Sequence, residues 1–452
     1  MTLHDTVALS IVLACALAML FMLRLYRKLR GTDGEWIRKL AHIGTGLLSI
    51  SLPWVFSSSM PVYIICGASI ALLLAIRYLP LIHNRLSGVL DDVARDSWGE
   101  IYFPVSVALL YHFAHGSKLL YAVPLVVLSL ADTVAALTGA EYGKHGYAAT
   151  GATKSMEGSV AFFSVAFFSV NVALVVFSDA GRIETLLISL DIALIVMLLE
   201  AIAWRGLDNI FVPLGVFITL RLYLAMPLGQ LWDRFRVGIA LVIFVTLYAR
   251  KTTLQGSALL ASALVLYISW ALGGWQWLLP PAILLLAYTF FFPGKITDAD
   301  RTHNVYAVLS IASVGLVWLF LSRIWQHPEF LFPYTLAFAI HLAIIAWNLL
   351  YPRHPSARRV MLACVLVSWS LMFAPYLLIE SGTRLALLQT SAALVICGVA
   401  FAAFYWLEPR QDGIYPTTGA RWLRQAAIVL VFTFLSALFS QLGQPKFFEK
   451  IL

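Results

Sequence analysis

The stretch Leu130–Ala161, LADTVAALTGAEYGKHGYAATGATKSMEGSVA, places charged residues and glycines between two long apolar segments. It holds one aspartate, two glutamates, five glycines and two lysines. Read as a helix, its first half puts Asp132, Gly139 and Gly143 on nearly one face. Small residues on a helix face allow another helix or a ligand to approach the backbone closely. The loop of residues 143–158 that follows has the composition of a phosphate-binding loop.

The composition outside this stretch is that of a membrane protein. Of the 452 residues, 61% are hydrophobic and 12% are charged, against roughly a quarter charged in ordinary globular chains. Continuous apolar runs of about 20 residues recur from end to end, and such runs indicate spanning helices rather than the alternating strands of a barrel. We therefore expect an all-α, polytopic integral membrane protein with about 14 to 16 transmembrane helices. The first run, Thr6–Leu23, is followed by a basic cluster and no small-residue cleavage site, which favours a retained span over a signal peptide.

The apolar runs predict eight spans in the first half and about eight more after residue 236. The spans predicted for the first half are Thr6–Leu23, Leu40–Phe56, Met60–Leu79, Ile101–Ala114, Leu119–Leu137, Gly158–Phe177, Thr185–Trp204 and Asn209–Leu224. The compact motifs of acids and glycines lie in the first half alone. We therefore expect a catalytic membrane domain over residues 1–225 and a second multi-span module, accessory or degenerate, over residues 226–452.

The distribution of charged residues predicts on which side of the membrane each loop lies. The net charge of +8 mostly records basic loops and anionic headgroups in a membrane protein, so it predicts no nucleic-acid partner. The loop 24–39 holds six Lys or Arg residues against two acids, which predicts a cytoplasmic position and an outside N-terminus. Alternation then places the loops 80–100, 139–157 and 205–208 on the cytoplasmic side too. The four cysteines lie in apolar stretches without CxxC spacing, so neither disulfides nor a zinc site is expected.

A basic motif opens the second span. Arg38 and His42 lie four residues apart and share a helix face, with Lys39 beside them. Arg and Lys at a membrane boundary commonly extend to the lipid headgroups. An ionisable group inside a span, such as His42, is by contrast a candidate for function.

An acidic cluster, Asp91-Asp92-Val-Ala-Arg95-Asp96, precedes the fourth span. Carboxylates at this density could hold a divalent cation, although solvated loops often have the same composition. Glu100, at the membrane edge after Gly99, is the stronger single candidate.

The opening stretch contributes a third group of residues. Asp132 lies within or at the end of a span, so we expect a metal ion or a lysine to neutralise it. Lys144 and Lys154 flank the loop, and the motif Lys154-Ser155-Met-Glu157-Gly158 then enters the next helix, whose free N–H groups suit a phosphate. The glycines do not form a P-loop, because Gly151 is followed by Ala-Thr instead of Lys-Ser/Thr.

The fourth group follows Glu200 at the end of the seventh span. Asp208 and Asn209 stand ahead of Pro213 at the start of a short span. Such a pair commonly caps a helix. The alternative is that Asp208 supplies a second metal ligand beside Asp132.

In combination these motifs resemble the phytol kinase and dolichol kinase family. The order is Arg38-Lys39-x2-His42-x3-Gly46, Gly99-Glu100, Asp132-x3-Ala136-x2-Gly139-x3-Gly143-Lys144, Lys154-Ser155-x-Glu157-Gly158-Ser159 and Asp208-Asn209-x3-Pro213. The resemblance extends over about residues 36–225. It implies a membrane kinase that phosphorylates an isoprenoid alcohol, with CTP as the donor.

The resemblance implies a division of roles. Mg²⁺ would be held by Asp132 with Asp208, and the catalytic residues would be Asp132 and a base chosen among His42, Glu100 and Glu157. The nucleotide would contact cations, glycines and polar side chains: Arg38, Lys39, Gly139, Gly143, Lys144, Lys154, Ser155, Gly158 and Asn209. Because the alcohol resides in the bilayer and the nucleotide in the cytoplasm, we expect the site at the cytoplasmic face of a bacterial plasma membrane.

Two other functions fit parts of the pattern. The stretch from Asp132 to Gly158 is also similar to the phosphatidate cytidylyltransferases, which make CDP-lipids from CTP. A lipid transporter or flippase would explain the many spans, although the two halves show no internal repeat. Residues 254–292 faintly resemble the start of the phytyl-phosphate kinase membrane family, without that family's downstream acidic motif.

Overall fold

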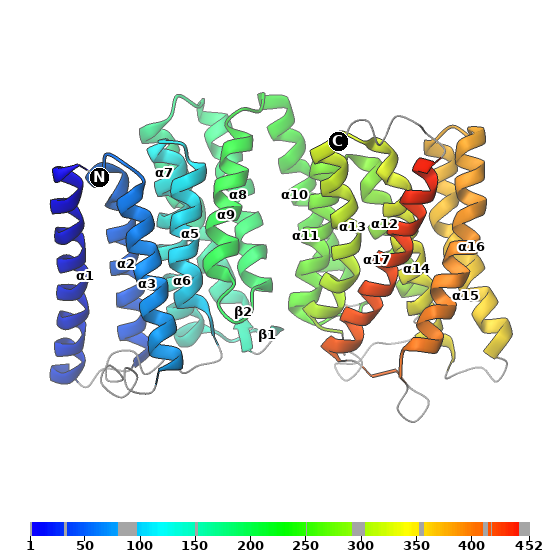
Figure 1. Cartoon of the computed structure of the whole chain (residues 1–452), viewed down its shortest axis with the longest axis horizontal. Coiled ribbons are helices and arrows are strands. Elements are labelled where there is room, and N and C mark those ends of the chain that lie inside the picture. The colour runs from blue at the N-terminus through cyan, green and yellow to red at the C-terminus, as the bar shows by residue number, and fades with distance from the viewer. Residues whose placement is uncertain are drawn as a thin grey trace. The chain divides into compact units, whose positions relative to one another are not determined.

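The protein is described by a computed structural model that covers residues 2–30, 34–79, 97–149, 152–249, 251–291, 303–351, 357–409, 415–416 and 418–442. Within these residues the chain forms 16 α-helices and one two-stranded antiparallel sheet. Figure 1 shows the long helices running roughly parallel to one another within each half of the chain. The prediction of an all-α polytopic membrane protein is confirmed.

By length and composition, 11 helices among the described residues could cross a membrane. The remaining long helices are shorter or more polar. Helix α2 (Gly34–Val55) is the informative case, because its first half carries the charged or ionisable side chains of Arg38, Lys39 and His42. A helix that bears a polar site is less apolar than its neighbours, so a search by hydropathy alone does not identify it as a membrane span.

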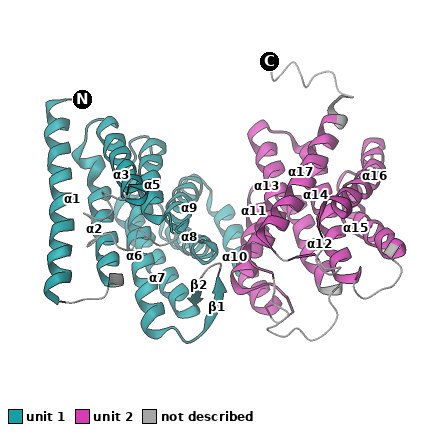
Figure 2. Cartoon of the chain, turned by 60° about the horizontal axis from the view of Figure 1, so that its bottom comes forward, with its two compact units in different colours: residues 1–239 teal, residues 240–452 magenta. Residues whose placement is uncertain are grey.

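The described residues divide into two compact units, Met1–Ile239 and Ala240–Leu452 (Figure 2). The division falls within helix α10 (Leu228–Tyr248), 14 residues after the join expected at residue 225. Each unit has its own core and is described by itself.

Unit 1 is built from eight helices before α10 and a hairpin. They are α1 (Leu3–Arg30), α2, α3 (Met60–Tyr78), α5 (Gly99–Phe113), α6 (Lys118–Tyr142), β1 (Gly146–Ala149), β2 (Ala152–Ser155), α7 (Met156–Phe177), α8 (Arg182–Ile202) and α9 (Asp208–Tyr223). Figure 1 places the C-terminal ends of α1, α3, α6 and α8 and the hairpin at the same, lower end of the unit. The polar motifs of the first half that the structure describes therefore lie at one end of the helices.

Helix α6 is the central element of unit 1 and packs against α2, α7 and α9. Ser117 caps its start by accepting a hydrogen bond from the Leu120 N–H. On the opposite side of the unit, Asp5 accepts hydrogen bonds from the hydroxyls of Ser57 and Ser58, which ties the start of α1 to the turn between α2 and α3.

Unit 2 surrounds a buried helix. Its helices after α10 are α11 (Gly256–Gly273), α12 (Trp275–Phe291), α13 (Val305–Trp325), α14 (Leu331–Leu350), α15 (Ala357–Ile379), α16 (Arg384–Leu407) and α17 (Gly419–Leu442). Helix α14 packs against α12, α13, α15, α16 and α17. Every residue from Leu331 to Ile344 is buried, and this run includes the polar side chain of His341.

Candidate active site

The centre of the site is an ion pair between the basic motif at the start of α2 and the stretch Leu130–Ala161. The Lys39 ammonium on α2 lies 2.7 Å from Oδ2 of Asp132 on α6. His42, one turn further along α2, places Nε2 3.8 Å from the same oxygen. This Nε2 is buried and has no hydrogen-bond partner among the described residues. The helix spacing of Arg38, Lys39 and His42 thus brings two cationic or ionisable groups to one carboxylate.

Asp208 and Asn209 reach this centre from the start of α9. The preceding loop is held in place because the Trp98 N–H donates to the Arg205 carbonyl at 2.9 Å. Gly206 has φ +86°, and a Cβ there would collide with the backbone of Gly99. The Asn209 side chain donates to the Gly206 carbonyl at 3.4 Å, while its own Oδ1 is buried and has no hydrogen-bond partner within the described ranges.

The two carboxylates belong to one electrostatic cluster. Asp208 is close enough to Asp132 for their negative charges to act on each other, and Lys39, His42 and Lys154 act on Asp208 as well. Carboxylates in this proximity repel unless cations lie between or beside them. The cluster therefore combines at least two acids with two lysines and an imidazole.

Lys154 enters the cluster from strand β2 through a buried pair. Its ammonium lies 2.7 Å from Oε1 of Glu200 at the end of α8, and it also donates to the Glu200 carbonyl. Burial lowers the pKa of Lys154, but the negative charges of Glu200 and Asp208 outweigh burial and raise the pKa above its usual value of 10.5. The ammonium is therefore charged at neutral pH.

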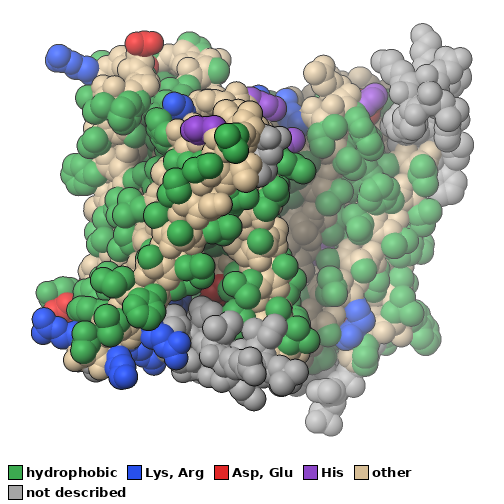
Figure 3. Space-filling model, turned by 60° about the vertical axis from the view of Figure 1, so that its left-hand side comes forward, with side chains coloured by type: hydrophobic (Ala, Val, Ile, Leu, Met, Phe, Trp, Pro, Cys, Tyr) green, Lys and Arg blue, Asp and Glu red, His purple; other side chains and the backbone are tan. Residues whose placement is uncertain are grey.

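A cavity of about 520 Å³ adjoins the cluster. Its polar end contains Arg38, Lys39, His42, Glu100, Asp132, Asp208 and Asn209. The rest of its wall is mainly apolar and comes from α1, α2, α3 and α5, with Ala16, Leu20, Ile65, Leu72 and Phe103 among its residues. Figure 3 shows Lys and Arg gathered at the lower end of unit 1, below a largely hydrophobic middle; Arg27, Lys28 and Arg30 of α1 belong to this end. One space thus joins charged groups to an apolar channel.

The glycines of the opening stretch lie where α6 and α7 touch. A Cβ on Gly139 would lie 3.0 Å from the Ser155 hydroxyl, and one on Gly158 would lie 3.0 Å from the Ala135 carbonyl. Gly143 also faces the Ser155 side chain. Ser155 caps α7 by accepting from the Gly158 N–H at 3.1 Å. These contacts are packing contacts; the nucleotide-binding roles predicted for the three glycines and Ser155 stay predictions.

The remaining predicted residues separate into two groups. Glu100 and Arg38 line the cavity. Glu157 instead binds His145, whose Nδ1 lies 2.7 Å from its Oε1, and Lys144 is exposed beside the hairpin. Neither Glu157 nor Lys144 lines the cavity. The cluster Asp91-Asp92-Val-Ala-Arg95-Asp96 lies outside the described residues.

The two carboxylates of the cluster would supply part of the ligands of a magnesium ion. Within the described ranges, no group of three or more His, Cys, Asp and Glu side chains is arranged to bind a metal. Mg²⁺ in nucleotide-dependent enzymes is commonly bound by one or two carboxylates plus phosphate oxygens and water. The Asp132 and Asp208 carboxylates fit that requirement.

Two contributions were not anticipated from the sequence. Glu200 was noticed as an acid at the end of a span, but its pairing with Lys154 links residues 46 positions apart. One face of α1 lines the cavity, through Val12, Ala16, Met19, Leu20 and Leu23. The residue types do not distinguish this face, because the middle of α1 is apolar on all sides. A pattern of residue types could have indicated the acid but not this face.

The chain is similar to a phytol kinase of Synechocystis sp., with 29% identity over 203 residues. The match covers 44% of this chain and 83% of the relative. No protein-family model matches the chain, and no solved structure does. More than half of the chain thus lies outside this match.

Proposed function

We propose that unit 1 is a kinase that transfers the terminal phosphate of a nucleoside triphosphate, CTP, to an isoprenoid alcohol. The observation that carries the proposal is the cavity whose charged end contains Lys39, His42, Asp132 and Asp208 and whose walls are otherwise apolar. Similarity to a phytol kinase supports the same substrate class. Dolichol and other prenols share with phytol a hydroxyl at the end of an isoprenoid chain, so they are substrates of the same class.

The apolar wall suits the hydrocarbon part of the alcohol. In a membrane, apolar walls favour a chain over water, and a polar end orients the single hydroxyl toward the charges. The alcohol would therefore lie along α1 and α3, with its oxygen near His42.

The charged end suits the triphosphate. Phosphoryl transfer needs positioning and neutralisation of negative charge more than covalent help from the protein. Arg38, Lys39 and Lys154 would hold phosphate oxygens, with Lys144 approaching from the hairpin. Asp132 and Asp208 would hold Mg²⁺, which when bound neutralises charge on the phosphates and aligns them.

His42 is the base that the geometry favours. His42 lines the cavity, and its buried Nε2 has no hydrogen-bond partner among the described residues, so it can accept the hydroxyl proton as the alcohol oxygen attacks the terminal phosphorus and CDP leaves. The Asp132 carboxylate, 3.8 Å away, would stabilise the imidazolium that forms. Glu100 remains an alternative base because it also lines the cavity.

We propose that the protein lies in the plasma membrane of a bacterium and that its site faces the cytoplasm. The basic residues at the end of α1, including Arg27, Lys28 and Arg30, lie on the side that positive charge marks as cytoplasmic. A nucleotide would be available on that side.

A labelling experiment with purified full-length protein tests the function. Protein in lipid nanodiscs receives Mg²⁺, CTP labelled at either the γ or the α phosphorus, and as acceptor either a C20 prenol or phosphatidic acid. Transfer of γ-label to the lipid supports the kinase, and transfer of α-label identifies a cytidylyltransferase instead. No labelled lipid from CTP, ATP, GTP or UTP with prenols of several lengths would refute the proposed kinase. Comparison of the four nucleotides also tests the choice of CTP.

A further inference from the structure

The cavity of unit 1 ends among buried side chains, away from its charged end. Leu52 on α2, Cys66 on α3 and Val107 on α5 line it there, and each is at most 3% exposed. The same three side chains belong to an apolar cluster that continues beyond the cavity. We call these three residues the floor of the cavity.

Packed side chains close the space behind the floor. One helical turn beyond the floor residues lie Phe56, Val62 and Leu110, which are buried in the cluster and lie outside the cavity lining. Tyr121 of α6 is also in the cluster, and its hydroxyl donates to the Ser49 carbonyl of α2 at 2.8 Å, which holds the two helices together at this level. Closely packed interiors do not admit extra groups without strain. A chain that reaches the floor therefore cannot continue in the same direction.

The distance from the charged end to the floor defines a chain length. Helix α2 rises about 15 Å from His42 to Leu52 and about 21 Å from Arg38 to Leu52, at 1.5 Å per residue. An extended chain advances about 1.2 Å per bond, so an isoprenoid unit with four main-chain bonds spans about 5 Å. With the hydroxyl held at the level of Arg38 to His42, the space accommodates about three to four units, which corresponds to C15 to C20 alcohols.

The bilayer restricts how such a space can select its substrate. A prenol comes from lipid tails that are as apolar as the wall of the cavity, so the transfer of each unit into the cavity gains little free energy. Affinity for the chain would therefore hardly distinguish long from short alcohols. A closed floor distinguishes them by exclusion, because a chain that is too long keeps its hydroxyl away from His42 or forces buried side chains apart.

We propose that Leu52, Cys66 and Val107 set the maximum chain length of the alcohol, so that the site phosphorylates prenols of up to about four isoprenoid units and excludes polyprenols of dolichol length. The proposal rests on the kinase function proposed for unit 1. It adds the residues that determine specificity for the chain.

Kinetics of the full-length protein in nanodiscs test the limit, with C10, C15, C20, C25 and C55 alcohols supplied at equal mole fraction. For the wild type we expect similar kcat/KM values for C15 and C20 and a value at least 100-fold lower for C55. Equal kcat/KM for C20 and C55 would show that long chains leave the cavity sideways, and this would overturn the proposal.

Two floor variants should shift the length profile in opposite directions. Leu52→Ala opens the cavity toward Phe56, so kcat/KM for C25 relative to C15 should rise at least tenfold. Cys66→Phe fills the end of the cavity, so kcat/KM for C20 relative to C10 should fall at least tenfold. Damage to the fold would instead lower the values for all lengths together. Length ratios unchanged from the wild type in both variants would overturn the proposal.

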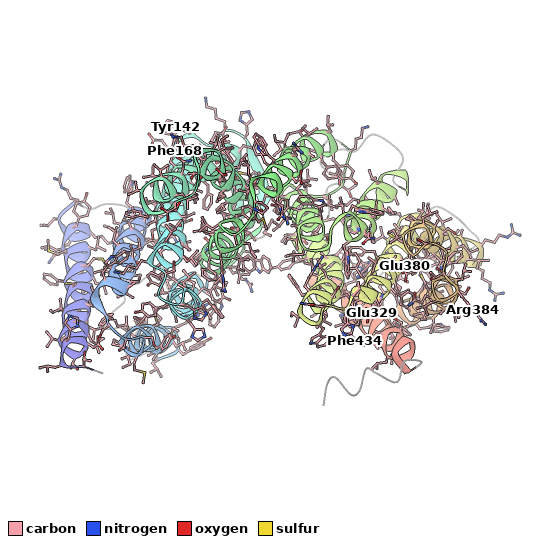
Figure 4. The ribbon with its side chains drawn as sticks, turned by 90° about the horizontal axis from the view of Figure 1, so that it is seen from above. Tyr142, Phe168, Glu329, Glu380, Arg384 and Phe434 are labelled. Atoms are coloured by element: carbon pink, nitrogen blue, oxygen red, sulfur yellow. The ribbon has the colours of Figure 1, made fainter. Side chains whose placement is uncertain are left out.

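Matched controls change similar bulk away from the floor. Phe168→Ala removes an apolar side chain from α7, where Phe168 is 62% exposed at the edge of unit 1 in Figure 4. Gly67→Phe adds a ring next to Cys66 on α3, at a position where a Cβ would meet nothing within 4 Å. Both variants should keep the wild-type length profile. A shift in either that equals the shift of the floor variants would contradict the assignment.

Photolabelling without nucleotide separates this proposal from the kinase function and uses the wild-type chain. A C15 or C20 alcohol with a diazirine on its last carbon should label the peptides of α2, α3 or α5 that contain the floor residues. Labelling confined to exposed residues such as Phe168 would overturn the proposal. Labelling at the floor without phosphate transfer from any nucleotide would support the floor as the end of a prenol-binding site and refute the kinase.

Discussion

The Lys39 ammonium and the Asp132 carboxylate lie 2.7 Å apart, although 93 positions separate them in the chain. Both side chains are largely buried, at 5% and 20% exposure. Moving two charges out of water costs free energy that one ion-pair contact rarely recovers. A buried ion pair beside a cavity is therefore better explained by function than by stability. The pair also fixes α2 and α6 in the register that brings His42 to the same carboxylate.

Substitution Asp132→Asn removes the carboxylate but keeps the shape. We expect lipid phosphorylation to fall by about 100-fold or more, because a preorganised charged group at the transferring phosphate is lost. The measurement is γ-label transfer to a prenol, with membrane insertion and monodispersity checked in parallel. Asp233→Asn, at an exposed position of α10, should retain full activity. An active Asp132→Asn would refute its proposed role.

Lys39→Met separates structure from chemistry. Alone it leaves Asp132 buried without its cation, which should cost about 3 to 5 kcal/mol of unfolding free energy. The double variant Lys39→Met/Asp132→Asn should recover most of this loss, as read from thermal unfolding in detergent, yet remain inactive. Recovered activity in the double variant would show that the pair is only structural.

Gly46→Ala tests the close approach of α2 and α6. A Cβ at Gly46 would lie 2.7 Å from the Ser129 Cβ, so the helices must separate and carry Lys39 and His42 away from Asp132. We expect a loss on the order of 10- to 100-fold in kcat/KM, since small displacements of catalytic groups are costly. Gly67→Ala on α3 is the control, because a Cβ there meets nothing within 4 Å; comparable losses in both variants would contradict the explanation.

Glu200→Gln should produce a pH-dependent loss of stability. In the wild type the pKa of Lys154 is raised, so the stability from this pair is fully present below 10.5 and is lost only as pH rises through the higher folded value. Without Glu200 the main attraction that offsets burial is gone, and the charged lysine is penalised at neutral pH. The stability gap between wild type and variant should therefore be largest near pH 7 to 9 and shrink at more alkaline pH. Glu141→Gln, exposed at the end of α6, should show no such gap.

Ala16→Trp tests where the hydrocarbon chain lies. Ala16 lines the cavity from α1, so an indole there should obstruct a long chain and raise KM for long prenols more than for short ones. Ala18→Trp places the same bulk on an exposed position of α1. Kinetic assays with prenols of increasing length should separate the two variants, and identical length profiles would refute this placement of the chain.

Parts of the site were predictable because their spacing is local. Arg38, Lys39 and His42 are within one helical turn, and an acid in a span, such as Asp132, demands a partner whatever the fold. The partner's identity was not predictable. Lys39, Lys154 and Lys144 were equivalent candidates by residue type, and only the packing of α2 on α6 brings Lys39 to Asp132 while Lys154 binds Glu200.

The sequence by itself determined that this chain forms apolar helices that can cross a membrane, because continuous apolar runs of sufficient length have no other means of satisfying their backbone in lipid. It also determined that polar motifs of the first half share one side, because spans alternate in direction. Only the tertiary structure decided how the stretch Leu130–Ala161 is used: Asp132 faces Lys39, and its glycines allow α6 and α7 to pack around Ser155. Such contacts depend on helix rotation and tilt, which uniformly apolar surfaces do not encode in residue type.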